Sequence, residues 1–284
     1  MIISQQDADL SITPILPLLK WAGGKRWLSD ELIAAFPDKI KRYYEPFLGG
    51  AAVFFALRPR RATLSDSNSE LINCYQQVQQ HPELVLKSLN KLRNSEANYY
   101  RVREASPEEP IDRAARLLFL TTLSFNGIYR QNLAGVFNVP YGKKTHVNPA
   151  DATRLLAASE ALQTVRLKCS DFEEATQGAG RGDLVYLDPP YTVAHGNNGF
   201  VKYNAKIFSW DDQIRLACIA RRLSDRGCFV FVSNADHISI RNLYKDFQLR
   251  VVERQSKIAA TAKHRKQISE CLFFNHEVIS ARTS

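Results

Sequence analysis

Short apolar runs and amphipathic stretches alternate in two separate regions of the chain. In the first region, the pattern predicts strands over Tyr43–Phe47 and Ala62–Ser65, with a helix over Ala51–Leu57 between them. A strand, a helix and a second strand in that order are typical of neighbouring parallel strands in an α/β sheet. This region therefore predicts one half of such a sheet.

The second region repeats the same order nearer the C-terminus. Leu184–Leu187 and Cys228–Val232 are predicted strands, because they are apolar, β-branched and aromatic and are bounded by glycine and polar residues. Trp210–Leu223 between them carries apolar residues close to helical spacing. Ser209 is the expected N-cap of this helix and Gly227 its C-terminal stop.

The C-terminal end is both strand-forming and basic. Val251–Glu253 and Cys271–Phe274 are expected to form a final hairpin, with the segment Lys257–Lys266 as its tip. From Arg241 to Ser284 the chain has nine Lys or Arg against four Asp or Glu, out of a net charge of +9 for the whole chain. Such an excess favours a polyanionic partner, although an ordinary solvated surface explains it equally well.

The middle of the chain differs from both regions, since it is helical by pattern. Helices are predicted over Ser69–Gln79, Pro82–Leu92 and Asp112–Phe125. Phe125–Lys144 is rich in asparagine, glycine and aromatic residues, which predicts a structured loop and hairpin rather than a linker. We therefore expect an α/β core made of residues 1–68 and 161–284, interrupted by an inserted domain over residues 69–160.

Composition excludes several classes of protein. The five cysteines are scattered without a C-x-x-C pair, and no H-E-x-x-H pattern occurs, so we expect neither a disulfide framework nor a metal site. The N-terminus lacks a basic segment ahead of an apolar stretch, and no apolar run approaches 18 residues. We therefore expect a cytoplasmic protein without a membrane association.

The strongest chemical signal is Asp188-Pro189-Pro190-Tyr191, directly after a predicted strand. The two prolines stiffen the backbone and remove two amide donors, which leaves carbonyl oxygens free to accept hydrogen bonds. Asp188 and the Pro189 carbonyl can then accept hydrogen bonds from the two hydrogens of an NH2 group. Tyr191 can stack on a planar base, which stabilises binding by about 1–3 kcal/mol. The alternative interpretation is a plain Pro-Pro turn after a strand.

A second signal is Glu45-Pro46-Phe47-Leu48-Gly49-Gly50, which ends the first predicted strand. Glycines at the carboxyl edge of a parallel sheet let the backbone approach a ligand closely. Asp66 ends the next strand, where an acid can accept ribose hydroxyls. Together they indicate an adenosine-containing ligand, or else a plain turn and a helix-capping aspartate.

A third segment is Lys20-Trp21-Ala22-Gly23-Gly24-Lys25. An aromatic ring beside a glycine pair and two lysines can form the wall of a pocket and contact a carboxylate. Without further context, the segment favours an exposed loop with one buried tryptophan.

Taken in order, six stretches resemble the Dam family of DNA N6-adenine methyltransferases. They are LKWAGGK, EPFLGG, LSDSNSELIN, FNGIYRQNLAGVFNVPYGK, LDPPY and VSNAD, and the resemblance spans roughly residues 16–275. It implies a Rossmann-like S-adenosylmethionine-dependent methyltransferase sheet with a reversed hairpin at one edge and a helical target-recognition insert. The substrate would be double-stranded DNA, with adenine in GATC as the target. We expect a monomer without an obligate protein partner.

The resemblance also assigns roles to individual residues. The implied contacts of S-adenosyl-L-methionine are Trp21, Lys25, Gly49, Gly50, Asp66 and Asp188. Asp188, Pro189, Pro190 and Tyr191 would form the catalytic tetrapeptide that holds the flipped adenine. The implied DNA-binding residues are Lys20, Phe125, Asn126, Ile128, Arg130, Pro140, Lys143 and Lys144. Arg130 matches an arginine that reads a guanine, and arginine is the expected reader of guanine O6 and N7 by geometry.

The chain departs from the family pattern at three places. Ala51 stands where the cofactor loop usually has glycine, so the cofactor is expected to sit slightly differently. Phe125 replaces a tyrosine that enters the duplex, which keeps stacking and loses a hydroxyl. Lys143-Lys144 replaces an Arg-Tyr pair. The target sequence is therefore less firmly predicted than the reaction.

Two other functions remain as alternatives. Related tetrapeptides serve amino-methyltransferases of ribosomal RNA, but the long stretch between Gly50 and Asp188 leaves room for a DNA-reading insert and favours DNA. A catalytically silent DNA-binding relative would keep the insert and lose the tetrapeptide, which is intact here.

Overall fold

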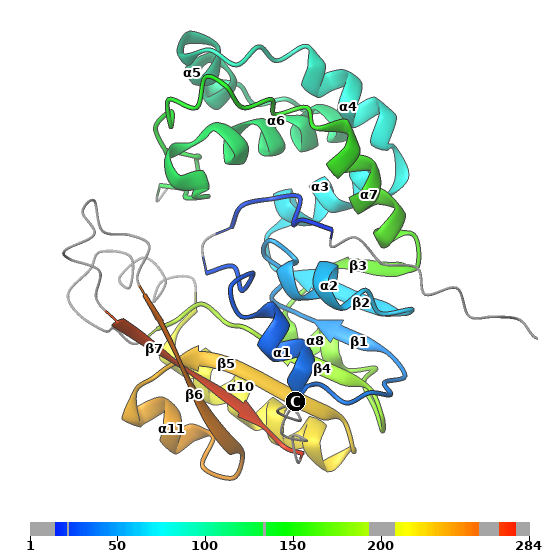
Figure 1. Cartoon of the computed structure of the whole chain (residues 1–284), viewed down its shortest axis with the longest axis vertical. Coiled ribbons are helices and arrows are strands. Elements are labelled where there is room, and N and C mark those ends of the chain that lie inside the picture. Colours follow the sequence, from blue (N-terminus) through cyan, green and yellow to red (C-terminus); the bar gives the residue numbers. More distant parts are fainter. Residues whose placement is uncertain (1–14, 22, 133–134, 193–207, 256–266, 277–284) are drawn as a thin grey trace, which may run out of the picture.

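A computed structural model describes residues 15–21, 23–132, 135–192, 208–255 and 267–276 of the chain. In this part of the chain, seven strands form one sheet in the order β3-β2-β1-β4-β5-β7-β6. The strands are β1 (Tyr43–Glu45), β2 (Ala62–Asp66), β3 (Val165–Cys169), β4 (Leu184–Leu187), β5 (Phe229–Ala235), β6 (Gln248–Gln255) and β7 (Gln267–Phe274). Strands β1 to β5 pair in parallel, whereas β7 is antiparallel to both β5 and β6. The sheet thus ends in a reversed hairpin (Figure 1).

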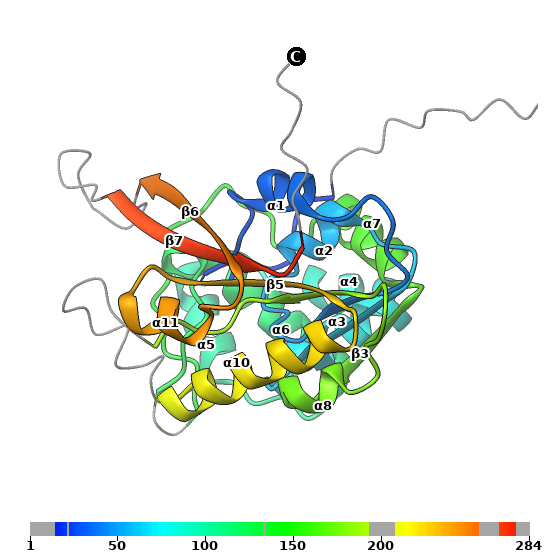
Figure 2. The same ribbon diagram turned by 90° about the horizontal axis from the view of Figure 1, so that it is seen from below.

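Helices cover both faces of this sheet. They are α1 (Ser29–Ala35), α2 (Ala52–Leu57), α3 (Ser69–Gln80), α4 (Pro82–Asn90), α5 (Glu96–Glu104), α6 (Pro110–Leu123), α7 (Ala152–Leu162), α8 (Phe172–Thr176), α10 (Trp210–Asp225) and α11 (Ile238–Leu243). Seen along the sheet, α1 and α2 lie on one side of β5, and α8 and α10 lie on the other (Figure 2). The arrangement is a three-layer α/β fold.

Alternation along β4 shows how the sheet separates two hydrophobic cores. Leu184 and Tyr186 belong to the core that includes α1 and α2, while Val185 and Leu187 belong to the core that includes α10. All four side chains are buried. A strand buried on both faces is expected for the centre of a parallel sheet, where successive side chains point to opposite sides.

The helices between β2 and β3 form a group of their own. In Figure 1, α4, α5 and α6 lie beyond the sheet, and α3 and α7 connect them to it. Helix α6 packs against α3, α4 and α5. The buried residues of this group, such as Leu71 and Phe119, continue the hydrophobic core on the α1 side of the sheet.

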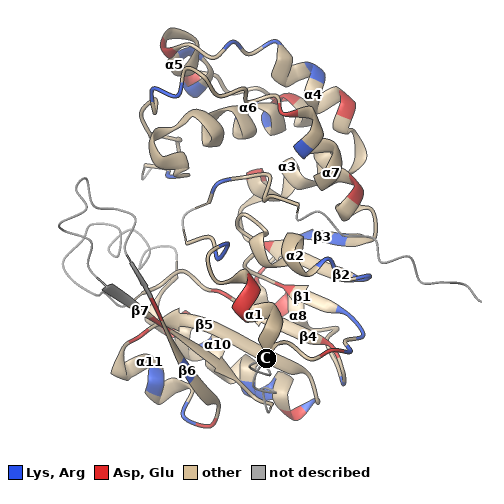
Figure 3. Cartoon of the chain, viewed as in Figure 1, with Lys and Arg blue, Asp and Glu red and all other residues tan. Residues whose placement is uncertain are grey.

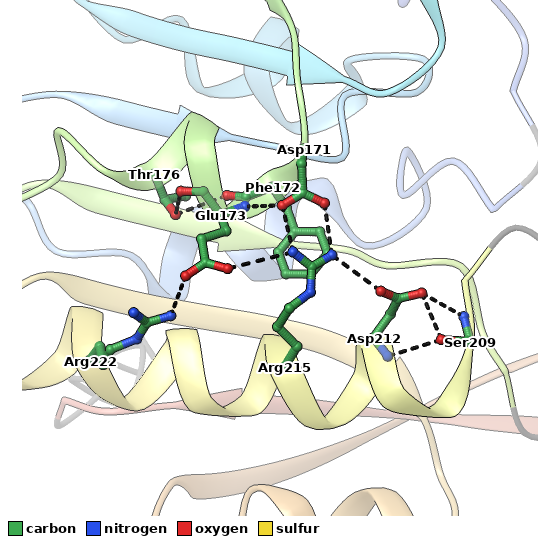
Figure 4. A network of polar contacts seen from close by, with 8 residues as sticks. All are labelled: Asp171, Phe172, Glu173, Thr176, Ser209, Asp212, Arg215 and Arg222. Carbon is green, nitrogen blue, oxygen red and sulfur yellow. Dashed lines mark hydrogen bonds and ion pairs between the residues drawn. The ribbon is translucent and has the colours of Figure 1, made fainter.

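A polar network fixes α10 against α8 (Figure 4). Arg215 pairs with Asp171 through two hydrogen bonds of 2.8 Å and lies over the ring of Phe172 at 4.1 Å. At the start of the helix, Ser209 and Asp212 form a capping box, as the sequence predicts for Ser209. These contacts anchor α10 to the start of α8.

Most predicted elements are confirmed, with shifted ends. Strand β1 stops at Glu45 instead of Phe47, because Pro46 has no N–H with which to continue the ladder. Helix α6 ends at Leu123, so its predicted extension to Phe125 is wrong. The backbone leaves the helix there because Ser124 is extended and Asn126 adopts a positive φ of 54°.

The final hairpin is confirmed as β6 and β7, and both strands are longer than the pattern predicts. The basic segment expected at its tip lies outside the described residues. Within Phe125–Lys144, the described residues 125–132 and 135–144 form the predicted hairpin, with isolated bridges between Ser124 and Tyr141 and between Gln131 and Phe137. Within the described residues, no helix is long and apolar enough to cross a membrane.

Candidate active site

Three neighbouring strands deliver the sequence-predicted residues to one edge of the sheet. Strand β1 pairs in parallel with β2 on one side and with β4 on the other. Their carboxyl ends therefore lie together, and Gly49, Asp66 and Asp188 stand at or just after these ends. In open parallel sheets, ligands bind outside the carboxyl ends of the strands where the strand order reverses.

Asp188 lies at the centre of a buried polar cluster. Its Oδ1 forms an ion pair with Nζ of Lys25 at 2.8 Å and accepts a hydrogen bond of 2.8 Å from the hydroxyl of Ser233. The Ser233 hydroxyl also contacts the hydroxyl of Tyr186 at 2.8 Å. Burial raises the pKa of Asp188, while Lys25 and Ser233 oppose that rise. The cluster thus places a cation and a hydroxyl donor on one oxygen of Asp188, whose side chain is 16% exposed.

Tyr191, the last residue of the tetrapeptide, is held from two directions. Its hydroxyl donates a hydrogen bond of 2.7 Å to Oε2 of Glu270. Nζ of Lys25 lies 4.9 Å from the centre of the Tyr191 ring and 3.7 Å from the same Glu270 oxygen. Lys25 is only 3% exposed, so the expectation of a merely exposed loop is wrong for this lysine. The structure brings Lys25, Asp188 and Tyr191 together.

The backbone of the tetrapeptide rests on side chains of α10 and β5. The buried Gln213 donates hydrogen bonds to the Pro190 carbonyl at 3.3 Å and to the Thr192 hydroxyl at 3.0 Å. Asn234, at the end of β5, in turn donates to the Gln213 side-chain oxygen at 2.9 Å. Because Gln213 and Asn234 are fully buried, this chain of bonds ties Pro190 and Thr192 to α10 and β5.

The glycine loop after β1 packs tightly against Trp21. Gly49 has a φ of +47°, and a β-carbon on it would lie 2.9 Å from Cδ1 of Trp21. A β-carbon on Gly50 would lie 3.0 Å from the Leu19 carbonyl. Asp66 accepts hydrogen bonds from the Gly49 amide at 3.1 Å and from the Asn68 amide at 3.0 Å. Burial raises the pKa of the Asp66 carboxyl, against these backbone bonds.

The backbone conformation at Ala51 explains why the family usually has glycine at this position. The alanine has φ 54° and ψ 32°, the left-handed region, immediately before α2. A side chain in that region costs about 1–2 kcal/mol relative to the right-handed one, whereas glycine enters it freely. The chain accepts this strain at a fully buried position beside the glycine pair.

Glu45, the first residue of the glycine-loop motif, is buried against Tyr43. The tyrosine hydroxyl donates a hydrogen bond of 2.9 Å to Oε2 of Glu45. Burial raises the pKa of this carboxyl to about 8, with the nearby Asp188 adding to the rise. Glu45 therefore carries a proton at neutral pH.

The predicted DNA-binding residues lie mainly on the hairpin after α6. Phe125 is 54% exposed, and its amide donates to the Pro140 carbonyl at 2.9 Å. Arg130 is exposed, and its Nε donates to the side chain of Asn138 at 2.9 Å. Asn126 and Pro140 are exposed, and Ile128 is half-buried.

The three predicted lysines differ in their surroundings. Lys20 is exposed and lies against Gly127, where a β-carbon would come within 2.6 Å of Cδ of the lysine. Lys143 is exposed. Lys144 is half-buried and donates a hydrogen bond of 2.7 Å to the Thr122 carbonyl, and burial lowers its pKa to about 8. Because Lys and Arg are spread over helices and sheet alike (Figure 3), charge alone does not locate a DNA surface.

Four buried polar residues of the site were not predicted: Gln213, Ser233, Asn234 and Glu270. Ser233 and Asn234 lie within VSNAD, one of the stretches that carry the family resemblance, yet no role followed from it. Glu270 offered a weaker signal, as a carboxylate directly before the apolar run Cys271–Phe274. Its pairing partners come from distant segments, so the sequence did not reveal them.

The sheet order and its reversed hairpin are those of a Rossmann-like methyltransferase. The chain belongs to the D12 class N6 adenine-specific DNA methyltransferase family, whose model matches residues 21–258. The family prediction made from the six stretches is therefore confirmed, and the chain is an adenine-specific DNA methyltransferase.

Individual relatives agree with this membership. The chain is 36% identical to the type II methyltransferase M1.LlaDCHI of Lactococcus lactis over 270 residues, covering 92% of this chain and 95% of that protein. It is 32% identical to the type II methyltransferase M.MjaIII of Methanocaldococcus jannaschii, covering 92% and 99%. It is 33% identical to the DNA adenine methylase of Escherichia coli K12, covering 89% and 93%.

Proposed function

We propose that the chain transfers a methyl group from S-adenosyl-L-methionine to N6 of adenine in double-stranded DNA, within GATC, after flipping the adenine out of the duplex. The observation that carries this proposal is the cluster of Asp188, Tyr191 and the buried Lys25 beside the glycine loop. It combines an anionic acceptor with an aromatic face at the edge of the sheet where a nucleoside ligand is expected.

The residues at the ends of β1 and β2 fit the cofactor. Each oxygen of Asp66 accepts one backbone hydrogen bond, which leaves further acceptor capacity for ribose hydroxyls. Gly49 and Gly50 present backbone without a side chain, and Trp21 with Lys25 forms the adjoining wall. When bound, S-adenosylmethionine supplies an electrophilic methyl group on a sulfonium.

The tetrapeptide would prepare the amino group. Adenine inside a duplex keeps N6 in the stack, so the base must leave it to reach the site. Lys25 and Ser233 both engage Oδ1 of Asp188, and we infer that Oδ2 and the Pro189 carbonyl accept the two amino hydrogens. These acceptors localise the nitrogen lone pair, so catalysis is mostly positioning and electrostatics. Tyr191 stacks on the base and Pro190 keeps the loop stiff.

The hairpin after α6 would read the target. Arg130 reads a guanine of GATC. Its hydrogen bond to Asn138 is made by Nε, so this bond does not occupy the terminal nitrogens that would contact the base. Phe125, exposed on the hairpin, enters the duplex, with Asn126, Ile128 and Pro140 as neighbouring contacts. Lys20, Lys143 and Lys144 contribute phosphate contacts, which add affinity without sequence information.

In this proposal the chain divides into two functional parts. Residues 1–68 and 161–284 form the catalytic, cofactor-binding domain, and residues 69–160 form the target-recognition insert. The partner is double-stranded DNA, and the protein acts as a monomer. The helical group beyond the sheet and its hairpin support this division.

The test is methyl transfer from labelled S-adenosylmethionine to three substrates. They are a duplex with GATC, the same duplex with its guanine changed, and ribosomal RNA. The proposal predicts labelling of the first duplex at N6 of adenine and at least tenfold slower labelling of the others. Faster labelling of RNA would favour the ribosomal RNA alternative. Binding to duplex DNA without any labelling would favour a silent DNA-binding protein.

A further inference from the structure

Glu270 contacts the candidate active site but has no role in the proposed chemistry. It lies on β7, the strand of the reversed hairpin that pairs with β5, and faces Ala235 across that pairing. Its side chain is only 3% exposed. A carboxylate buried to this degree requires hydrogen-bonded or charged partners, because desolvation of an isolated charge is costly. Its partners include Tyr191 of the tetrapeptide and Lys25.

One oxygen of Glu270 contacts two groups of the candidate active site. Oε2 accepts the Tyr191 hydroxyl at 2.7 Å and lies 3.7 Å from the ammonium of Lys25. The shorter contact is the tyrosine bond, and a hydroxyl–carboxylate bond is among the stronger hydrogen bonds in proteins. Lys25 has nearer partners, namely Asp188 at 2.8 Å and the Gly23 carbonyl at 3.0 Å. Glu270 therefore matters more for Tyr191 than for Lys25.

We propose that Glu270 is a positioning residue for methyl transfer, which anchors the Tyr191 hydroxyl and so fixes the orientation of the ring that stacks on the flipped adenine. The inference rests on the proposed role of Tyr191 as the stacking residue. The Tyr191 hydroxyl is held by β7, and the carbonyl of the preceding residue, Pro190, is held by Gln213, so the tyrosine is anchored on two sides. Such pre-positioning matters because misplacement of a reacting group by about 1 Å costs on the order of 100-fold in rate.

The test is a double-mutant cycle on the full-length protein with duplex DNA and saturating S-adenosylmethionine. Glu270→Gln removes the charge and keeps an acceptor, Glu270→Ala removes both, and Tyr191→Phe keeps the ring and removes the hydroxyl. Glu174→Gln, which neutralises an exposed acid on α8, is the matched control. The measurements are the single-turnover methyl-transfer rate, the dissociation constant of S-adenosylmethionine and the thermal midpoint.

We expect Glu270→Ala and Tyr191→Phe each to lower the rate at least tenfold, and Glu270→Gln to recover to within about threefold of wild type. Because Glu270 acts through the Tyr191 hydroxyl, its effect should vanish when that hydroxyl is absent. Adding Glu270→Ala to the Tyr191→Phe variant should therefore lower the methyl-transfer rate less than twofold further. The dissociation constant of S-adenosylmethionine stays within threefold throughout, since Lys25 keeps its nearer partners. Where the alanine variant does not fold, Glu270→Asp replaces it, because the shorter side chain draws the carboxylate away from the hydroxyl; it should lower the rate at least tenfold alone and less than twofold further in the Tyr191→Phe background.

Two outcomes overturn the inference. Either Glu270 substitutions are as harmful with phenylalanine at position 191 as with tyrosine, or Tyr191→Phe methylates at the wild-type rate. A Tyr191→Ala variant separates this from a failure of the proposed function. If the alanine variant is slow and the phenylalanine variant is normal, stacking stands and only the anchoring role of Glu270 fails. If both are normal, the stacking role itself is wrong.

Discussion

The rings of Trp21 and Tyr129 stack with their centres 4.5 Å apart and their planes 15° from parallel. Trp21 belongs to the segment that closes over the glycine loop, and Tyr129 belongs to the hairpin that carries Arg130. The proposed cofactor site and the proposed DNA-reading hairpin are therefore in direct contact. Lys20 against Gly127 forms a second contact between the same two segments.

We predict that Tyr129→Ala weakens S-adenosylmethionine binding although Tyr129 is not a proposed cofactor contact. A stacked aromatic pair contributes about 0.5–1.5 kcal/mol beyond the buried area, so the dissociation constant should rise roughly 2–13-fold. Tyr129→Phe keeps the stack and should stay within about twofold of wild type. Calorimetric titration of both variants checks this, and equal affinity of Tyr129→Ala and wild type would show that the stack does not support the cofactor site.

Asp188→Ala should lower the single-turnover methylation rate by at least the roughly 100–1,000-fold typical of one transition-state electrostatic contact. The reason is the loss of the acceptor proposed for the N6 amino group. Asp246→Ala removes an exposed acid and serves as the control, with an unchanged rate. A rate for Asp188→Ala within threefold of wild type would remove this residue from the chemistry.

Asp66→Ala should raise the dissociation constant of S-adenosylmethionine and change DNA affinity little. The carboxylate both offers acceptors to the ribose hydroxyls and holds the Gly49 amide at 3.1 Å, so its loss also releases the glycine loop. Titration with cofactor and, separately, with duplex DNA measures the two affinities. Unchanged cofactor affinity would contradict the proposed site.

Glu45 predicts a pH dependence of stability. Its pKa is about 8 in the folded protein, raised from 4.5 by burial. Between these values the unfolded chain releases the proton and the folded chain keeps it, so stability is fully present below about pH 4.5 and is lost as pH rises through about 8. Glu45→Gln should flatten this fall and raise the free energy of unfolding at pH 8 by about 1 kcal/mol or more.

Denaturant titrations at pH 5.5 and pH 8 measure the effect of Glu45→Gln. The control is Glu31→Gln, which neutralises an exposed acid on α1 and should keep the wild-type pH dependence. If the Glu45 variant loses stability with pH as steeply as wild type, the carboxyl is not protonated in the folded state.

Arg130→Ala should relax the preference at one base of the target rather than weaken binding uniformly, because a bidentate contact to guanine contributes about 1–3 kcal/mol of discrimination. Lys143→Ala should do the opposite, with lower affinity on every sequence and a flatter salt dependence. Methylation of duplexes changed at single positions of GATC measures both. Uniform loss in Arg130→Ala would assign that residue to the phosphate backbone.

Sequence alone predicts the central strands and the tetrapeptide because both are local signals. The apolar run of β4 and the two prolines after it need no partner to be recognised. Helix α5 was not predicted, since it contains few apolar residues and relies on the buried Tyr99 and Val102 for its packing. Strand β3, which forms an edge of the sheet with exposed and half-buried positions, lacks a strong apolar run.

The polar core of the site could not be predicted for a different reason. The residues that meet there are far apart in the chain. Lys25 lies in a loop before α1, Asp188 directly follows the central strand β4, and Glu270 lies on the hairpin strand β7. Spacing in the sequence does not encode which buried charges meet, because sheet order decides it. The family resemblance pointed to Lys25 and Asp188, whereas only the pairing of β7 with β5 brings Glu270 to Tyr191.

The proposed activity is adenine N6 methylation in GATC, with Asp188 as the acceptor for the amino group. The most direct test maps N6-methyladenine across DNA from cells that lack adenine methylation and express either the wild-type chain or Asp188→Ala. We predict N6-methyladenine in GATC with the wild-type chain and none with the variant. A consensus other than GATC would refute the target while leaving the chemistry in place. Equal methylation by the Asp188→Ala variant would contradict the role of Asp188, and no methylation by the wild-type chain would contradict the proposed activity.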